Sequence, residues 1–178
     1  QKVETIILQG RECLERRDLN CALIFFNKAQ SIDAEHDLVK SLAAKIKAFQ
    51  MEIQTRARER EKAIAAFIKK AKACRAKNNY DCTIAQANRA LQLDSNNFDA
   101  IRMKSEAELS KRQQIANKNK VGILVQEGRE CLKKKKYNCA VGKADSALDI
   151  IPDNAAALQL RKAAIHEQNK LKSSIKIN

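Results

Sequence analysis

The chain has 178 residues and a net charge of +14, with 35 Lys and Arg residues against 21 Asp and Glu residues. One proline, four glycines and no tryptophan argue against a sandwich, a barrel or another fold built on many tight turns. Hydrophobic residues make up 44% of the chain but aromatic residues only 4%. We therefore expect an all-α fold whose core consists of Ala, Leu, Ile and Val.

The sequence contains no membrane or export signal that we can identify. No apolar run approaches the roughly 20 residues that a membrane-spanning helix needs, and no charged segment followed by an apolar one stands at Gln1. We therefore expect a chain without a transmembrane segment, from which an export signal has been removed or lies upstream. The helical pattern close to Gln1 also indicates a fragment or a processed chain.

Three segments of the chain align without a gap. They begin at Gly10, Ala71 and Gly128, so the copies are 61 and 57 residues apart, and they read GRECLERRDLNCALIFFNKAQSID, AKACRAKNNYDCTIAQANRALQLD and GRECLKKKKYNCAVGKADSALDII. Three copies at nearly regular distances predict an array of similar units. We place the units at residues 3–53, 54–110 and 111–178.

Each copy predicts a helix, a short turn and a second helix. In the first helix an apolar residue, a small residue and a cysteine stand at i, i+4 and i+7, which places them on one face; they are Ile6, Gly10 and Cys13, then Phe67, Ala71 and Cys74, then Leu124, Gly128 and Cys131. Polar turns are expected at Asp18-Leu19-Asn20, Asn79-Tyr80-Asp81 and Tyr137-Asn138. The second helix then carries a cysteine in its first turn and a small residue later, at Cys21 and Ala29, Cys82 and Ala90, and Cys139 and Ala147.

Long helices are expected between the copies. The runs from about Asp37 to Lys77 and from Asn97 to Lys136 contain no proline, and Asn97 and Asn154 fit the position of a helix cap. Leu38, Leu42, Ile46, Phe49 and Ile53 keep one apolar face, whereas 54–61 and the corresponding 110–120 are polar. At 1.5 Å per residue the first run would be about 60 Å long, with a solvated middle, and we expect an extended array.

This pattern resembles the tetratricopeptide repeat (TPR), a helix-turn-helix unit of about 34 residues. The resemblance is carried by the run 147–158, which contains Pro152, by the small residues of the first helix, and by the small position at Ala22, Thr83 and Ala140 of the second. The sequence departs from the family in its longer period, in having one proline, and in placing a cysteine where the family has a large aromatic residue. The resemblance implies three TPR-like units joined by long helices.

The six cysteines form three pairs, and the members of each pair are eight positions apart. Cysteines on the two sides of a helix-to-helix turn can reach the Cα separation of about 4.4–6.8 Å that a disulfide requires, so we predict bonds within each copy: Cys13 with Cys21, Cys74 with Cys82 and Cys131 with Cys139. Buried free thiols are the alternative. Zinc binding fits less well, because zinc takes four ligands and His36 and His166 lie far from the pairs. Disulfides would indicate an oxidising compartment, namely the periplasm, the cell surface or secretion.

Positive charge predominates in the middle and C-terminal thirds of the chain, with its sharpest cluster at Lys133 to Lys136. We interpret this cluster first as a solvated helix end, where the helix dipole favours positive charge, and an anionic partner is the functional alternative. The TPR resemblance implies a concave groove lined by the first helices, where the residue after the small one would face the groove. That residue is Arg11, Lys72 or Arg129, and Ile7, Ile68 and Val125 would add apolar area to the groove.

No catalytic motif stands in the sequence: there is no nucleophile elbow, no phosphate-binding glycine loop and no H-E-x-x-H. We therefore expect a non-enzyme without a cofactor or metal. The leading hypothesis is an interaction module, an adaptor or assembly scaffold of an exported or bacterial envelope protein, that binds a protein or peptide with acidic groups. The alternative is a basic module that binds nucleic acid, anionic lipid or acidic glycan, although stacking aromatic residues for nucleic acid are few.

Overall fold

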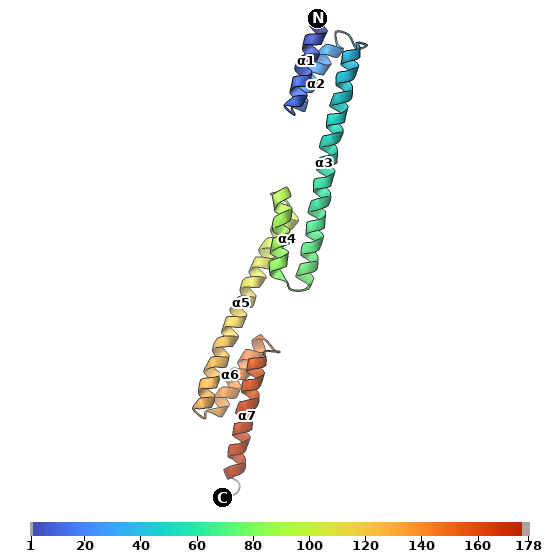
Figure 1. The fold of residues 1–178 in the computed structure, drawn as a ribbon. Helices are drawn as coiled ribbons and strands as arrows, with labels where there is room; N and C mark the ends of the chain where they lie inside the picture. The colour runs from blue at the N-terminus through green and yellow to red at the C-terminus, as the bar shows by residue number, and fades with distance from the viewer. Residues whose placement is uncertain (1, 176–178) are drawn as a thin grey trace. The chain divides into compact units, whose positions relative to one another are not determined.

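The structure is a computed structural model that describes residues 2–175. Within these residues the chain forms seven α-helices and no strand, which confirms the predicted all-α class (Figure 1). The helices are α1 (Lys2–Glu15), α2 (Leu19–Gln30), α3 (Asp37–Ala76), α4 (Tyr80–Leu93), α5 (Phe98–Lys133), α6 (Tyr137–Ile150) and α7 (Ala155–Ile175). No helix in the described part of the chain is long and apolar enough to cross a membrane.

The chain divides into two compact units. The first contains residues 1–69 with 89–95, and the second contains residues 70–88 with 96–178. Each predicted cysteine pair lies within a single unit, at the turn between two consecutive helices: α1 and α2, α3 and α4, or α5 and α6. We refer to these three turns with their helix ends as hairpins 1, 2 and 3.

The two long helices are continuous. Helix α3 has 40 residues and α5 has 36 residues, so at 1.5 Å per residue they are about 60 Å and 54 Å long. Both begin within one residue of the predicted start. The Asn97 side chain accepts a hydrogen bond from the backbone N–H of Ala100 and caps α5, and Asn154 does the same for Ala157 at the start of α7. These caps satisfy N–H groups that a helix start leaves without a partner.

The core of hairpin 1 joins α1 and α2 with the first three turns of α3. Its buried side chains are Ile6, Ile7, Cys13, Ala22, Ala29, Val39, Leu42 and Ile46. Gly10 lies in this core because a Cβ at this position would stand 2.9 Å from Cδ2 of Leu42 and 3.3 Å from Cβ of Phe25. The small residues predicted for the helix contact therefore permit the close approach of these helices.

The core of hairpin 3 joins the C-terminal half of α5 with α6 and α7. Its buried side chains are mainly alanine, in two clusters: Val121, Val125, Ala147 and Ala157, then Ala140, Ala144, Leu160 and Ala164. In hairpin 2 the fully buried positions of α4 include Thr83 and Ala87, and Ala100, Met103 and Ala107 are buried on α5. Alanine thus predominates among the buried side chains of hairpins 2 and 3, whereas Ile, Leu and Val supply most of the core of hairpin 1. These are the residue types expected for the core from the low aromatic content.

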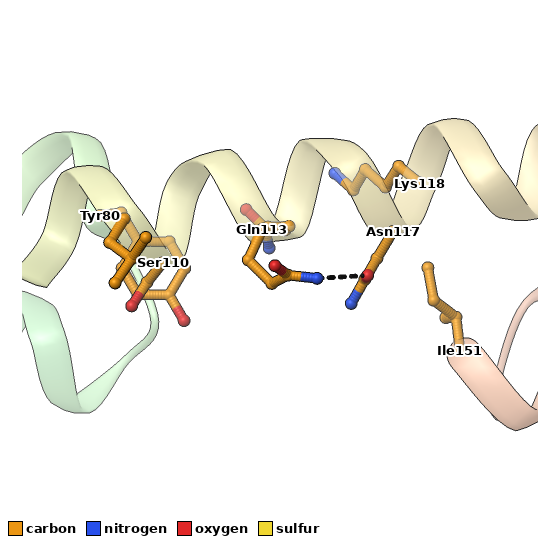
Figure 2. A pocket seen from close by; sticks show the side chains of 8 residues that line it. Tyr80, Ser110, Gln113, Asn117, Lys118 and Ile151 are labelled. Carbon is orange, nitrogen blue, oxygen red and sulfur yellow. Dashed lines mark hydrogen bonds between the residues drawn. The ribbon is translucent and has the colours of Figure 1, made fainter.

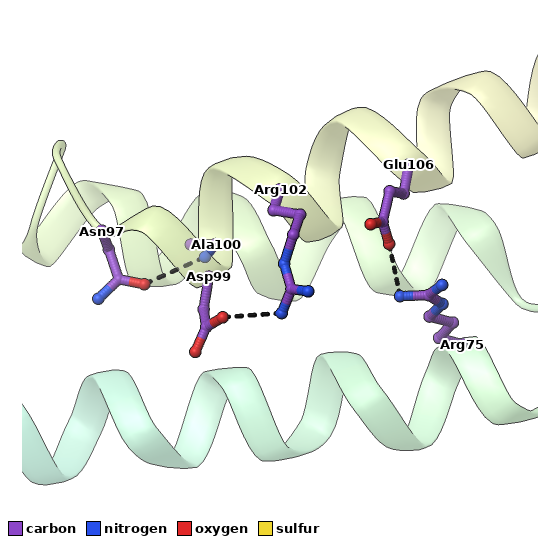
Figure 3. Close-up of polar contacts among 6 residues, drawn as sticks. All are labelled: Arg75, Asn97, Asp99, Ala100, Arg102 and Glu106. Carbon is purple, nitrogen blue, oxygen red and sulfur yellow. Dashed lines mark hydrogen bonds and ion pairs between the residues drawn. The ribbon is translucent and has the colours of Figure 1, made fainter.

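Ion pairs on the surface connect α5 to hairpin 2. Arg75 at the end of α3 donates to Glu106 over 2.5 Å, and Lys111 donates to Asp81 at the start of α4. Figure 3 shows the first of these pairs beside the start of α5, where Arg102 also pairs with Asp99. Exposed pairs contribute little individually, so the packing of α5 rests on its buried face.

Candidate functional site: the cysteine hairpins and the cavities beside the long helices

The three hairpin turns share one backbone conformation. In each turn one residue takes a left-handed conformation, namely Arg17 at φ 60°, Asn78 at φ 53° and Lys135 at φ 58°. The N–H of the next residue then donates to the carbonyl oxygen of the first cysteine: Asp18 to Cys13 over 2.8 Å, Asn79 to Cys74 over 3.0 Å and Lys136 to Cys131 over 2.8 Å. This bond closes the end of the first helix. The turns comprise residues 16–18, 77–79 and 134–136, so they begin two or three residues before the predicted ones; Asp18 and Asn79 are correctly placed, and the other predicted turn residues belong to helices.

The predicted cysteine pairing is confirmed at disulfide distance in all three hairpins. The Cα atoms of Cys13 and Cys21 are 5.6 Å apart, those of Cys74 and Cys82 are 5.7 Å apart, and those of Cys131 and Cys139 are 5.8 Å apart. All three values lie inside the range in which a disulfide forms. The alternative of three pairs of free thiols therefore does not describe this structure, in which all six cysteines are bonded.

The second cysteine of each pair is the third residue of its helix, and the starts of these three helices are capped differently. Asp18 accepts from the N–H of Cys21 over 2.9 Å, and Asn79 accepts from the N–H of Cys82 over 3.0 Å. In hairpin 3 the corresponding residue is Lys136, which makes no side-chain cap bond. Hairpin 3 therefore lacks the side-chain N-cap hydrogen bond that stabilises the second helix in hairpins 1 and 2.

The disulfides also differ in their access to solvent. Cys13 is fully buried and Cys21 is half-buried, whereas in hairpin 3 Cys131 is half-buried and Cys139 is exposed. All four lysines from Lys133 to Lys136 are exposed beside this third bond. The bond of hairpin 3 is thus both the most accessible of the three and the one with the most positive surroundings.

The predicted cationic groove residues occupy different environments. Arg11 is half-buried and lines a cavity of about 740 Å³ between α1 and α3, and its Nε is buried without a hydrogen-bond partner. Lys72 on α3 and Arg129 on α5 are exposed. Arg129 lines a cavity of about 580 Å³ that also contains Val125.

The predicted apolar groove residues are buried. Ile7 is 1% exposed, Val125 is 5% exposed and Ile68 is 9% exposed. Ile7 belongs to the core of hairpin 1, and Val125 to the core of hairpin 3. These side chains therefore stabilise the helix packing, and their contact with a partner stays a prediction.

The middle of α5 forms one side of a cavity of about 700 Å³. Figure 2 shows its wall: Gln113 and Asn117 lie one turn apart and share a hydrogen bond of 2.9 Å, between Tyr80 of α4 and Ile151 after α6. Leu109, Ser110, Gln114 and Lys118 complete the lining. The segment that we predicted to be polar and solvated is thus the open, amide-lined wall of a cavity.

The middle of α3 carries a cluster of arginine, glutamate and phenylalanine side chains, in contrast to the amide side chains of α5. The sequence patterns above did not identify this cluster. Arg17 of the hairpin 1 turn donates from Nη2 to Oε1 of Glu52 over 2.9 Å, and its guanidinium lies 5.2 Å from the centroid of the Phe49 ring. Arg56 donates to the same Glu52 oxygen over 2.7 Å. The hydrogen bond from Arg17 lowers the pKa of Glu52, as do the positive charges of Arg17 and Arg56, whereas its desolvation raises the pKa.

A signal for this cluster exists in the sequence. Phe49, Ile53, Arg56 and Arg60 follow one another at spacings of three and four, which places them on one helix face. Arg17 could not be added to that face from sequence, because it stands 35 residues before Glu52 and reaches it only through the fold.

The comparisons with known proteins do not extend this description: no protein-family model, curated protein or solved structure matches the chain. Among the residues that the structure describes, no three His, Cys, Asp or Glu side chains gather in a way that could hold a metal ion. The candidate site thus consists of three disulfide-linked hairpins, beside which lie cavities lined by charged or amide side chains.

Proposed function

We propose that the chain is a non-enzymatic interaction module of the TPR type, which acts as an adaptor or assembly scaffold in an exported or bacterial envelope protein. One observation carries this proposal: each of the three repeated hairpins holds its cysteines at disulfide distance within an all-helical chain. Disulfides persist in oxidising compartments, and arrays of helical hairpins present surfaces to partners.

The cavities beside the helices support binding over catalysis. They lie open on the surface, and apart from Arg11, whose Nε is buried, their charged groups pair with one another or face solvent. The arginine partners of Glu52 lower the pKa of this carboxyl group. A lowered carboxylate pKa favours ion pairing and disfavours proton transfer near neutral pH.

A photo-crosslinking experiment tests the proposal. A photoreactive amino acid replaces Lys72, an exposed residue of the predicted groove, and the oxidised chain is irradiated in its native extract. We expect one discrete protein adduct, whose purified form then binds the chain in a manner that depends on the partner's sequence. Adducts with nucleic acid alone would contradict the proposal.

A basic module that binds polyanions is the second candidate. It is supported by the exposed run from Lys133 to Lys136 and by Lys118 and Arg129, none of which makes an ion pair within the described residues. Binding of this kind weakens log-linearly with salt because counterions are released. A salt titration with heparin and with the crosslinked partner therefore separates the two functions.

A further inference from the structure

A cavity of about 370 Å³ lies beside the turn of hairpin 1. We call it the arginine groove, and its lining consists of Arg17, Phe49, Ile53, Arg56, Ala57 and Arg60. All of these except Arg17 belong to α3, where they follow the packed segment that ends with the buried Ile46. The groove is therefore a continuation of the apolar face of α3 beyond the core of hairpin 1, with arginines added to it.

The fold holds Arg17 over this groove. Its left-handed backbone is part of the turn that the Cys13–Cys21 bond closes, and its side chain is fixed by Glu52 and by the ring of Phe49. Cation–π contact and an ion pair act together on this one guanidinium. Arg17 is thus a preorganised charge, and less ordering entropy is lost when a ligand binds beside it.

The groove carries more positive charge than its own carboxylate can compensate. Glu52 is the acceptor for both Arg17 and Arg56, while Arg60 is exposed and makes no ion pair within the described residues. Glu59 and Glu61 flank Arg60 in sequence, but one residue corresponds to about 100° of helix rotation, and neither lines the groove. Three guanidinium groups therefore face one carboxylate.

We propose that the arginine groove binds an acidic segment of a partner protein, in which an apolar side chain stands between carboxylates. This inference rests on the proposed function as an interaction module and assigns it a surface. Guanidinium groups bind carboxylates through two parallel hydrogen bonds, which suits Arg56 and Arg60. In the same groove, Ile53 is 44% exposed and Ala57 is half-buried, so these two residues offer apolar contact to the side chain between the carboxylates.

The same geometry disfavours a nucleic acid in this groove. Single-stranded nucleic acids bind through aromatic rings on which bases stack, and the one ring in the groove, that of Phe49, is already in contact with Arg17. The Glu52 carboxylate also stands among the arginines, where it would repel a run of phosphates. A peptide with a few carboxylates suits a groove of three arginines and one glutamate better than a chain of phosphates does.

The corresponding part of α5 has no arginine cluster in its cavity, so this cluster is a feature of α3. The cavity beside the middle of α5 is lined by Ser110, Gln113, Gln114 and Asn117, with Lys118 as its one cation and no arginine (Figure 2). Amide groups bind backbone and neutral polar groups as readily as carboxylates. A solvated helix middle therefore does not by itself produce an arginine cluster.

The chain offers a matched pair of variants for the test. Arg60 and Arg58 are both exposed and lie on the same helix, but Arg58 points away from the groove because it stands about 180° around the helix from Phe49. The probe is a fluorescein-labelled peptide of alternating glutamate and leucine, and its glutamine analogue is the uncharged control. Fluorescence anisotropy with the full oxidised chain measures the dissociation constants.

We expect Arg60→Gln to raise the dissociation constant of the glutamate peptide about tenfold, since a charge-assisted hydrogen bond is lost. Arg58→Gln should leave the constant within a factor of two, and the glutamine analogue should bind weakly to all chains. Circular dichroism should show equal melting temperatures for the two variants. Equal weakening in both variants would overturn the proposal, because binding would then follow net charge alone.

Two further results would also overturn it. The first is that the glutamate peptide fails to bind the unaltered chain at physiological salt. The second is that oligothymidylate binds the chain more tightly than the glutamate peptide does, with the same dependence on Arg60, which would make the groove a nucleic-acid site. Failure here is distinguishable from failure of the proposed function. If the partner crosslinked at position 72 still binds the Arg60→Gln chain unchanged, the interaction module stands and only this surface is wrong.

Discussion

Gly128 of α5 lies directly against Leu160 of α7: a Cβ built on Gly128 would stand 2.5 Å from the Cδ2 atom of Leu160 and 3.2 Å from Cβ of Lys143. The helices of hairpin 3 thus approach one another over a surface that leaves no room for a methyl group. The tip of Leu160 can move, but this side chain is only 4% exposed and has little space to do so.

We expect Gly128→Ala to lower the free energy of unfolding by about 1–2 kcal/mol, because an extra methyl group in a packed core forces neighbours to shift. Urea denaturation of the oxidised chain measures the change. Gly142→Ala on α6 is the control, since nothing lies within 4 Å of the Cβ position there. That substitution should raise stability by up to about 1 kcal/mol, because glycine is a poor helix former. The close approach is refuted if both variants gain stability.

Lys136→Asn should raise the stability of hairpin 3 by about 1 kcal/mol, because the new side chain can accept from the helix start as Asp18 and Asn79 do in the other hairpins. Thermal denaturation of the oxidised protein provides the measurement. Lys134→Asn removes the same charge from the same lysine run, but this residue is the C-cap of α5 and not the N-cap of α6. An equal gain in the two variants would attribute the effect to charge repulsion and contradict the role of the cap.

The double substitution of Cys74 and Cys82 by Ala should lower the stability of the oxidised chain by roughly 2–3 kcal/mol, the value that loop-closure entropy assigns to a short loop. Under reducing conditions the same substitution should have a much smaller effect. The comparison requires melting curves of both chains with and without a reductant. An equal loss under both conditions would mean that the thiol side chains matter through packing alone.

The Cys131–Cys139 bond should be reduced before the other two. Cys139 is exposed while Cys13 is fully buried, and the adjacent lysines attract an anionic thiol and stabilise the thiolate that leaves. Brief treatment with limiting mercaptoethanesulfonate, followed by alkylation and peptide mapping, gives the order. High salt should reduce the preference, because it screens the lysines, without reversing it. First labelling at Cys13 or Cys21 would contradict this prediction.

Glu52 should titrate below its ordinary value of 4.5, since the bond from Arg17 favours its charged form. Because the pKa is lowered in the folded state, the stabilisation is present above the unfolded-state pKa and is lost as the pH falls through the folded-state pKa. Carboxyl NMR during an acid titration follows this change. Arg17→Gln should raise the pKa of Glu52, and Arg58→Gln should not. An unchanged pKa in the Arg17 variant would show that the ion pair does not form in solution.

The sequence predicted the features that rest on local patterns. The apolar spacing from Leu38 to Ile46 and the cap residue Asn97 predicted the two long helices, whose observed ends lie within about three residues of those expected. The constant spacing of cysteines predicted the three bonds. Such features are visible in sequence because helix geometry fixes which residues share a face.

Other features depend on conformations or contacts that leave no local trace. Arg17 and Lys135 adopt left-handed backbones that favour glycine or asparagine, so their residue types gave no warning of the conformation, whereas Asn78 is a common choice there. Leu19 and Asn20 were assigned to the turn although they begin α2, and Asp18, which does lie in the turn, also caps this helix. The arginine groove required the contact between Arg17 and Glu52, which only the folded chain brings together.

The alanine-rich cores have a practical consequence for anyone preparing this protein. Alanine buries little area, so hairpins 2 and 3 gain modestly from the removal of water, and in both of them a disulfide also links the two helices. Expression in a host cytosol, where glutathione keeps thiols reduced, would yield the same polypeptide without these bonds. The choice of expression host and purification buffer therefore decides which form of the molecule is being studied.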